Sequence, residues 1–191
     1  MKFRRIFGKN DIVGQNRMWR LLMELKPIQA KELTANTFRT IGDEWLLICT
    51  NDRDHERINM MTASWGGLGI LWNREVVYLF VRPQRYTHKL LGEQDRFSVL
   101  VLPDSLKATH KVFGSLSGRD LDKISETGLT PIMLDGVSAV EEAKLVLVVK
   151  KLYEDIIKKE GFLEEALLKN YPNEDFHTVY VCEIEKVYCK E

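Results

Sequence analysis

Short strand-type segments recur along most of this chain, and they constrain its fold more than any other feature of the sequence. Each segment is rich in Val, Ile, Leu, Tyr or Phe and is followed by polar residues typical of turns. In the last segment Tyr180, Cys182 and Ile184 share one face, which is the alternation expected of a strand with one buried side. The predicted strands are 44–50, 57–64, 75–82, 96–102, 143–152 and 177–188.

Helix-type segments are short and lie between the strands. Asp104 and Ser117 are the expected N-caps of the second and third of them, and Gly114 and Gly128 are expected to end these two helices. Because strands outnumber helices and do not alternate strictly with them, the pattern predicts a mainly β fold. A partly open antiparallel barrel with short helices is favoured over a doubly wound parallel sheet. The predicted helices are 85–93, 104–113, 118–127 and 162–169.

The chain is long enough for one domain with its own core. Its 191 residues are 45% hydrophobic and 29% charged, and they include no internal repeat and no Pro/Gly/Ser-rich linker. The first twenty residues hold six basic groups against one Asp and lack the continuous apolar core of a signal peptide. We therefore expect residues 1–26 to form a basic arm, either loosely attached or helical, and residues 27–191 to form a single domain.

Charge and cysteine content argue against several classes of protein. Lys and Arg together number 28, as do Asp and Glu, so the net charge is zero, which argues against a dedicated nucleic-acid binder. The longest charge-free stretch, 59–73, includes three Gly and falls short of the roughly 18 apolar residues that a membrane span needs. The three cysteines form no C-x-x-C pair and favour a reduced, cytoplasmic location.

Catalytic and metal-binding patterns are absent from the sequence. GGLG at 66–69 lacks the spacing of a dinucleotide-binding G-x-G-x-x-G, and no phosphate-binding P-loop occurs. GSLSG at 114–118 has Leu116 where a nucleophile elbow needs Ser. The acidic stretch 52–56 lacks the Gly and Glu of a calcium loop and is more typical of a solvated hairpin turn. We therefore expect no metal and no catalytic side chain.

Three segments are suited to an anionic aromatic ligand, although each also has a purely structural explanation. NMMTASWGG at 59–67 runs from a strand into small residues that let the backbone approach a flat ligand, and an ordinary glycine-rich turn has the same composition. VRPQRYTH at 81–88 places two Arg and a Thr where a strand ends and a helix begins, a place that favours an anion or surface Arg beside a capping Thr. GSLSGRDLDK at 114–123 offers hydroxyls and charges between two helices, or a capping box at a helix corner.

Taken together and in this order, the three segments resemble one known family. NMMTASWGGLGILWN, VRPQRYTHKLL and GSLSGRDLDK are similar to motifs of the flavin-reductase-like proteins with the FMN-binding split barrel, a family that includes flavoredoxin. The similarity covers about residues 27 to 188 and leaves the basic arm outside. It implies a six-stranded antiparallel split β-barrel, a homodimer, and one FMN bound non-covalently by each subunit near the dimer interface.

The resemblance also implies which residues bind the cofactor. The strand-end segment would line the flavin ring and its ribityl chain through Asn59, Thr62, Ala63, Ser64 and Trp65. Phosphate contacts would come from Arg82, Arg85 and Thr87. A later segment would close over the cofactor through Ser117, Gly118, Arg119, Asp120 and Lys123. Relatives often carry His directly before the Ser-Gly pair, where this chain has Leu116.

The function that the resemblance implies agrees with the lack of catalytic patterns, because FMN itself carries the redox chemistry. It implies an NAD(P)H-dependent FMN oxidoreductase, which would take a hydride from NAD(P)H and reduce free flavin or another small-molecule acceptor. An alternative is a flavoredoxin-like electron-transfer protein that is reduced by a redox-protein partner. A third interpretation is a barrel that binds no cofactor.

Overall fold

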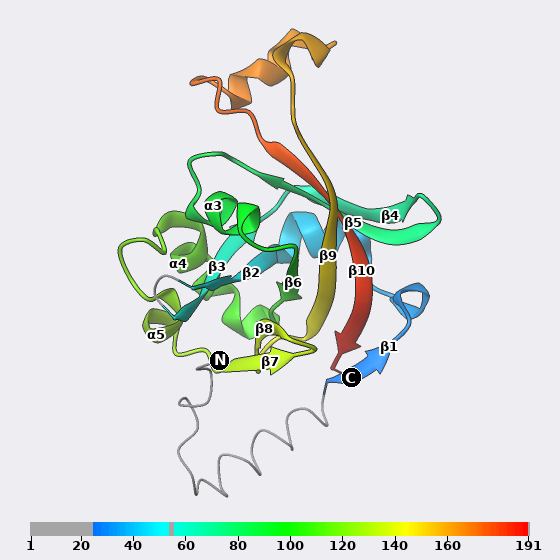
Figure 1. Cartoon of the computed structure of the whole chain (residues 1–191), viewed down its shortest axis with the longest axis vertical. Helices are drawn as coiled ribbons and strands as arrows, with labels where there is room; N and C mark the ends of the chain where they lie inside the picture. Colours follow the sequence, from blue (N-terminus) through cyan, green and yellow to red (C-terminus); the bar gives the residue numbers. More distant parts are fainter. Residues whose placement is uncertain (1–24, 54–55, 191) are drawn as a thin grey trace, which may run out of the picture.

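The computed structural model describes residues 25–53 and 56–190, so the predicted N-terminal arm lies outside it except for its last two residues. Strands make up most of the described chain (Figure 1). Their bounds are β1 Lys26–Ile28, β2 Leu46–Asp52, β3 Arg57–Ala63, β4 Gly66–Leu71, β5 Arg74–Val81, β6 Arg96–Val101, β7 Pro131–Leu134, β8 Val137–Val140, β9 Leu145–Ile156 and β10 Thr178–Cys189.

Short helices connect the strands. The α-helices are α2 Thr37–Arg39, α3 Tyr86–Gly92, α4 His110–Ser115 and α5 Lys123–Thr127. The 3-10 helices are η2 Ala30–Glu32, η4 Asp104–Thr109, η5 Lys159–Gly161 and η6 Glu165–Asn170, and η3 Thr40–Glu44 is a π-helix.

The main sheet is antiparallel and runs in the order β3–β2–β6–β9–β10–β5–β4, with β1 added along β10. The first and sixth strands of this order, β3 and β5, come within 8 Å of each other between Cα atoms. No ladder joins them in the described chain. The six strands from β3 round to β5 therefore form an antiparallel split barrel, and the predicted fold class is confirmed.

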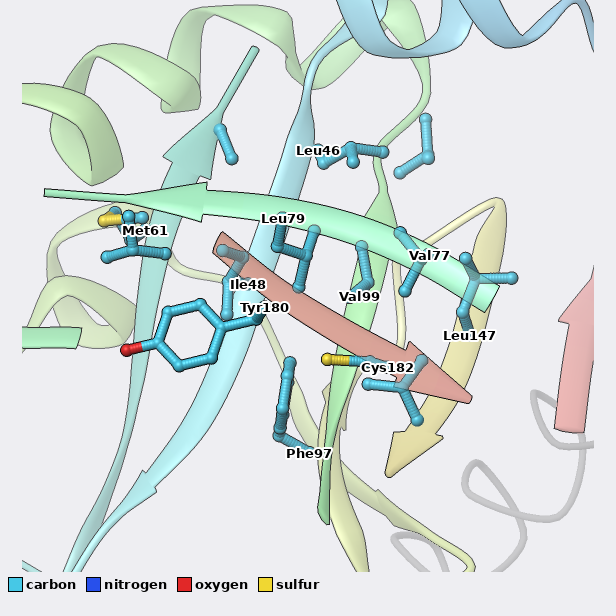
Figure 2. Packing of buried hydrophobic residues seen from close by; sticks show 14 of the residues in the cluster. Leu46, Ile48, Met61, Val77, Leu79, Phe97, Val99, Leu147, Tyr180 and Cys182 are labelled. Atoms are coloured by element: carbon cyan, nitrogen blue, oxygen red, sulfur yellow. The ribbon is translucent and has the colours of Figure 1, made fainter. Parts of the chain in front are cut away.

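Both faces of the barrel wall are buried, which explains why most of the predicted strands lack a simple alternation of apolar and polar residues. In β2, Leu46 and Ile48 belong to the cluster inside the barrel, where Phe97 and Tyr180 are the largest side chains (Figure 2). The intervening Leu47 belongs to a second cluster on the outer face. A strand that is covered on both sides is apolar at nearly every position.

Two hairpins were not predicted from the sequence. GGLGIL forms β4, and a Cβ on Gly66 would lie 2.7 Å from Tyr78 O, so glycine lets β4 pair closely with β5. Strands β7 and β8 form a separate hairpin through Asp135 and Gly136, which both have positive φ. An Asp-Gly pair between short apolar runs is a recognised hairpin signal, and it was overlooked.

Two of the predicted helices differ from the structure at their starts. The segment predicted as 104–113 is a 3-10 turn followed by α4, and the Asp104 side chain caps neither. The segment predicted as 118–127 becomes helical only at Lys123, because Asp122 and not Ser117 is the cap: its carboxylate accepts from the Ile124 and Ser125 backbone N–H groups. The predicted stop at Gly128 is confirmed by its left-handed conformation, with φ of 67°.

Residues 157–177, which connect β9 to β10, are called the arm below. The arm projects from one end of the barrel (Figure 1). It carries η5 and η6, so the predicted helix at 162–169 is replaced by a shifted 3-10 helix. The aromatic rings of Phe162, Tyr171 and Phe176 pack on one another near its base, with centroids 4.8–5.9 Å apart.

The three cysteines lie in different environments. Cys49 and Cys182 are fully buried, and burial raises the pKa of each thiol to about 12. Cys189 is half-buried at the end of β10.

In residues 25–53 and 56–190 no helix has the length and apolar character to cross a membrane. The same described ranges contain no group of three or more His, Cys, Asp or Glu placed to hold a metal ion.

Candidate functional site

Two basic side chains, Arg85 and Lys123, meet at the C-terminal end of α4. Arg85 donates from Nη1 to Gly114 O (2.8 Å) and from Nη2 to Phe113 O (3.2 Å). Lys123 Nζ donates to the same Phe113 O (3.2 Å) and to Met60 O on β3 (3.0 Å). The Phe113 and Gly114 carbonyls lie at a helix C-terminus, where acceptors lack partners within the helix, and Met60 O lies on β3, so the two cations tie α4 to β3. We call Arg85, Lys123 and these three carbonyls the cation cluster.

The local fold brings the two cations together from distant parts of the sequence. Arg85 is the N-cap of α3, and its Nε also donates to Met61 Sδ (3.3 Å). Lys123 is the first residue of α5, which the Asp122 carboxylate caps. Each cation is therefore fixed at a helix start, and each reaches across to α4 and β3.

The cation cluster is electrostatically unbalanced. In residues 25–53 and 56–190 neither Arg85 nor Lys123 has a carboxylate within ion-pairing distance. Lys123 is 4% exposed, and burial together with the charge of Arg85 lowers the pKa of its ammonium to about 8. Burial also lowers the pKa of Arg85. Guanidinium has five N–H donors and ammonium three, so both side chains keep donors beyond the bonds described. An anion at the cluster would relieve the repulsion between the two charges.

Asn59, next in sequence to Met60, forms the floor of a tightly packed contact. Its Nδ2 donates to Thr87 Oγ1 (2.9 Å) and to Thr50 Oγ1 (3.2 Å). Its Oδ1 is buried and has no hydrogen-bond partner among the described residues. A Cβ on Gly118 would lie 2.2 Å from this oxygen, so a side chain at 118 would push the loop off β3. The structure thus brings the predicted residues Asn59, Thr87 and Gly118 together.

Thr62 lies at the end of β3 against the first residue of α4. Its Oγ1 donates to His110 O (3.1 Å) and lies 3.1 Å from His110 Nδ1. Because a hydroxyl has one proton, the His110 ring nitrogen then donates to Oγ1, which keeps one acceptor position for a ligand. Burial, and to a smaller degree Lys107, lower the pKa of His110 to about 4, so this imidazole is neutral at pH 7.

The end of the first predicted segment is partly exposed. Ala63 is buried at the end of β3, whereas Ser64 is exposed. Trp65 is 45% exposed, and its ring lies on that of His177, with centroids 5.0 Å apart and planes tilted by 45°. A planar ligand could contact the exposed part of the indole, while His177, which packs on the indole, belongs to the arm.

Arg82, the other arginine predicted to bind phosphate, is held away from the cation cluster. Its guanidinium donates to Asp175 Oδ2 (2.5 Å) and to Asn170 O (2.7 Å), both in the arm. Its carbon Cζ lies 5.2 Å from the centroid of the Tyr171 ring. The structure therefore does not bring Arg82 to Arg85, although two residues separate them.

The remaining predicted residues lie in the turn between α4 and α5. Asp120 N donates to Ser117 O (3.2 Å), and Arg119 N donates to Ser117 Oγ (3.2 Å). The Arg119 guanidinium lies over the Tyr86 ring, 5.1 Å from its centroid. Arg119 and Asp120 are exposed, so this turn presents both charges to solvent next to Gly118.

Two surface hollows lie away from the predicted site. One of about 340 Å³ is lined by residues of the arm and its base, among them Ile156, Phe162 and Tyr171. The other, of about 450 Å³, lies between charged residues that include Arg39 and Lys107. Neither hollow is lined by a predicted site residue.

Sequence reasoning missed the residues that support the site from behind. His110 contacts Thr62 and His177 contacts Trp65, and no sequence motif links the members of either pair. Tyr171 and Asp175 belong to a part of the chain with no strong pattern. Nothing in the linear sequence pairs them with Arg82, because that pairing depends on the path of the arm.

The barrel topology places this protein in the class of small antiparallel split barrels. A model of the flavin reductase-like domain matches residues 38–191, which is most of the chain. The chain therefore belongs to the flavin reductase-like family, as the sequence resemblance predicts.

Solved structures of this family have a similar fold. The FMN-binding domain of a flavin reductases-like enzyme from Shewanella baltica OS155 has a TM-score of 0.63 and 14% identity, over 87% of this chain and 77% of that one. Flavoredoxin of Desulfovibrio vulgaris (Miyazaki F) has a TM-score of 0.61 and 23% identity, over 87% and 76%. The styrene monooxygenase flavin reductase of Pseudomonas putida S12 has a TM-score of 0.58 and 14% identity, over 91% and 86%. A comparison with curated proteins gave no match.

Proposed function

We propose that this protein binds FMN non-covalently and is an oxidoreductase that transfers a hydride from NAD(P)H to FMN and passes the electrons on to free flavin or another acceptor. Its membership of the flavin reductase-like family supports this function. The FMN-binding domain from Shewanella baltica and the flavin reductase from Pseudomonas putida, which share its fold, support it further. The observation that carries the proposal is the cation cluster.

The cation cluster fits the phosphate of FMN. Two buried positive charges without a carboxylate partner suit a dianion, and both cations have spare N–H donors. Thr87 lies in the first turn of α3, which follows Arg85, and its hydroxyl accepts a hydrogen bond from Asn59. Arg85 and Lys123 would hold the phosphate, and Asn59, Thr87 and Gly118 would keep the loop and helix around it in place.

FMN, when bound, supplies a ring that accepts a hydride and releases electrons singly or in pairs. The protein's part is to bind the phosphate, to contact the ring and to leave one of its faces open. Thr62 would accept a hydrogen bond from the ligand, because its proton is already donated to His110 O. Trp65 would form one wall of the ring site.

We expect the working unit to be a homodimer. Trp65 and Leu116 are both more than 40% exposed in the single chain, although they flank the segments assigned to FMN. Large apolar side chains at such positions are typical of surfaces that a partner covers.

The decisive experiment mixes purified protein, loaded with FMN, with NADH or NADPH in the absence of oxygen and follows flavin absorbance. Rapid bleaching is expected. A protein that does not take up FMN, or whose flavin stays oxidised with both nucleotides, would contradict the proposal.

A second candidate function is that of a flavoredoxin-like carrier reduced by another protein. The observation that favours it is Leu116, which is 43% exposed and has no polar group to contact a nicotinamide, in a position where relatives often have His. In the same experiment this carrier would be bleached by a reduced redox protein and not by either nucleotide.

A further inference from the structure

Arg82 and Arg85 belong to one short motif, and the chemistry of the motif suggests the same role for both. We propose instead that Arg82 is a positioning residue: it anchors the arm and, through Tyr171 and His177, sets the position of the Trp65 indole at the wall of the flavin ring site. In this arrangement Arg82 takes no part in phosphate binding. The inference rests on the proposed function for the identity of the ligand, and on the contacts in the described chain for everything else.

The arm balances the charge of the Arg82 guanidinium. Asp175 Oδ2 accepts from Nη1, and Asn170 O accepts from Nη2 at 2.7 Å. Gln84 Nε2 donates to the same carboxylate oxygen at 2.6 Å, so the carboxylate is fixed from two sides. These two donors hold the pKa of Asp175 below its usual range, and the carboxylate stays charged at neutral pH. A phosphate at Arg82 would meet a guanidinium whose charge a carboxylate already balances, unlike at Arg85.

The rings of Tyr171 and His177 connect Arg82 to Trp65. The guanidinium lies against the face of Tyr171, with Cζ 5.2 Å from the ring centroid. The Tyr171 hydroxyl lies 2.9 Å from His177 Nδ1. His177 in turn lies against the Trp65 indole, with centroids 5.0 Å apart. Tyr171 and His177 are both buried, so neighbouring side chains restrict both rings.

The register of β5 and β10 places Arg82 and His177 at the same corner of the barrel. Val81, the last residue of β5, pairs with Thr178, the first residue of β10. Arg82 directly follows Val81 and His177 directly precedes Thr178, so both lie at the end of this ladder where the arm joins the barrel. His88 Nε2 also lies 2.9 Å from Thr178 Oγ1, which fixes this corner to α3.

The Trp65 indole is positioned by its backbone and by the His177 ring. Gly66, directly after Trp65, pairs closely with β5, which restrains the backbone next to Trp65. The indole is 45% exposed, and His177 is the aromatic neighbour that contacts it. Loss of the Arg82 anchor should therefore release the arm first, then Tyr171 and His177, and finally the indole.

The test compares Arg82→Met and Arg82→Lys with Arg74→Met. Arg74 is a matched control, since it also pairs with a carboxylate, that of Glu183 at 2.6 Å, and is the first residue of β5, at the end of this strand far from Trp65, whereas Arg82 directly follows its last residue. The first measurement is the fluorescence of Trp65 in protein without FMN, obtained as the difference between each variant and the same variant carrying Trp65→Phe. Arg82→Met should move this emission to longer wavelength. Arg82→Lys should move it less, because lysine keeps the positive charge, and Arg74→Met should leave it unchanged.

The second measurement is the ratio of affinities for FMN and riboflavin, with the visible circular dichroism of bound FMN. Arg82→Met should change the dichroism but keep the ratio within about twofold, whereas Arg85→Met should lower the ratio by at least about tenfold. Unchanged Trp65 emission in both Arg82 variants would overturn the inference, and so would a loss of the ratio equal to that of Arg85→Met. If Arg82→Met does not fold, Arg82→Lys decides. A protein that binds no FMN would contradict the proposed function, while the emission of Trp65 would still decide the role of Arg82.

Discussion

The cation cluster and the base of the arm hold two arginines from one motif in opposite electrostatic conditions. Arg82 donates to a charged carboxylate and a carbonyl, so its charge is balanced by the arm. Arg85 donates to two carbonyls and a thioether sulfur, and its nearest charged partner in the cluster is another cation, Lys123. The same side-chain type thus serves as a structural anchor at one position and has capacity for an anion at the other.

The difference shows that spacing within a motif does not define the role of a charged residue. A guanidinium that is paired with carboxylate gains little from a second anion, because the Coulombic attraction is already used and both groups lose water. A cation held by carbonyls alone keeps an unbalanced charge. The assignment of a phosphate site therefore depends on what else each arginine touches, which is a property of the tertiary structure.

The largest effect is expected from Arg85→Met, which removes one charge of the cation cluster. Each charged hydrogen bond contributes about 1.5–3 kcal/mol, so the affinity for FMN should fall by roughly 10- to 150-fold. The affinity for riboflavin, which has no phosphate, should change little. Titration calorimetry with both ligands measures the contrast. Equal weakening of the two ligands would contradict the phosphate assignment and remove the distinction between the two arginines.

The next effect concerns the fit of the loop that leads into Lys123. Gly118→Ala would place a Cβ 2.2 Å from Asn59 Oδ1, and the free energy of unfolding should fall by about 1–3 kcal/mol. Gly92→Ala is the matched control, because a Cβ there meets no atom within 4 Å. Urea denaturation of the two variants gives the comparison. A Gly118→Ala variant as stable as Gly92→Ala would show that the loop is not held against β3.

The effect that is smallest per unit of change is a pH dependence that belongs to the cation cluster and not to the arm. Lys123 has a pKa of about 8 in the folded protein against 10.5 as an ordinary lysine, so above pH 8 the unfolded chain binds more protons than the folded one. The contribution of Lys123 to the free energy of unfolding of the FMN-free protein should therefore rise with pH, by up to about 1.4 kcal/mol per unit, between about pH 8 and pH 10. It is measured as the difference between the protein and Lys123→Met. The affinity for FMN should fall over the same range, by up to about tenfold per unit, because the neutral amine attracts phosphate less.

Lys123→Met is the control for this prediction and should remove both trends. Denaturation at several pH values and FMN titration under the same conditions provide the two measurements. The buried thiols of Cys49 and Cys182 have the opposite effect on stability, because their pKa values are raised from 9.0 to about 12, so above about pH 9 they lose protons in the unfolded chain first. Subtracting the values for Lys123→Met cancels this contribution. A Lys123-dependent part of the stability that changes in the same direction as the affinity would exclude Lys123 as the titrating group.

The barrel could be predicted because its strands carry their own signals. All six predicted strands start within two residues of where the structure places them, and β10 is one residue out at each end. The β7–β8 hairpin was available from its Asp-Gly turn. The glycine-rich strand β4 was not, because its pairing depends on Tyr78 from the next strand and not on its own composition.

The candidate site was predictable in its residues and less so in its geometry. Asn59, Thr87 and Gly118 come from three separate motifs, and the fold brings them together. Arg82 could not be separated from Arg85 by inspection, since Asp175 lies 93 positions away and reaches it only through the path of the arm. Long-range pairing of this kind leaves no local pattern.

The burial of Cys49 and Cys182 gives the molecule a pair of internal reporters. Cys49 belongs to the cluster outside the barrel wall and Cys182 to the cluster within it, while Cys189 stays partly accessible. A thiol-specific alkylating reagent should thus modify one site per folded chain at once, and the later labelling of the other two would time separately how often each half of the interior admits solvent.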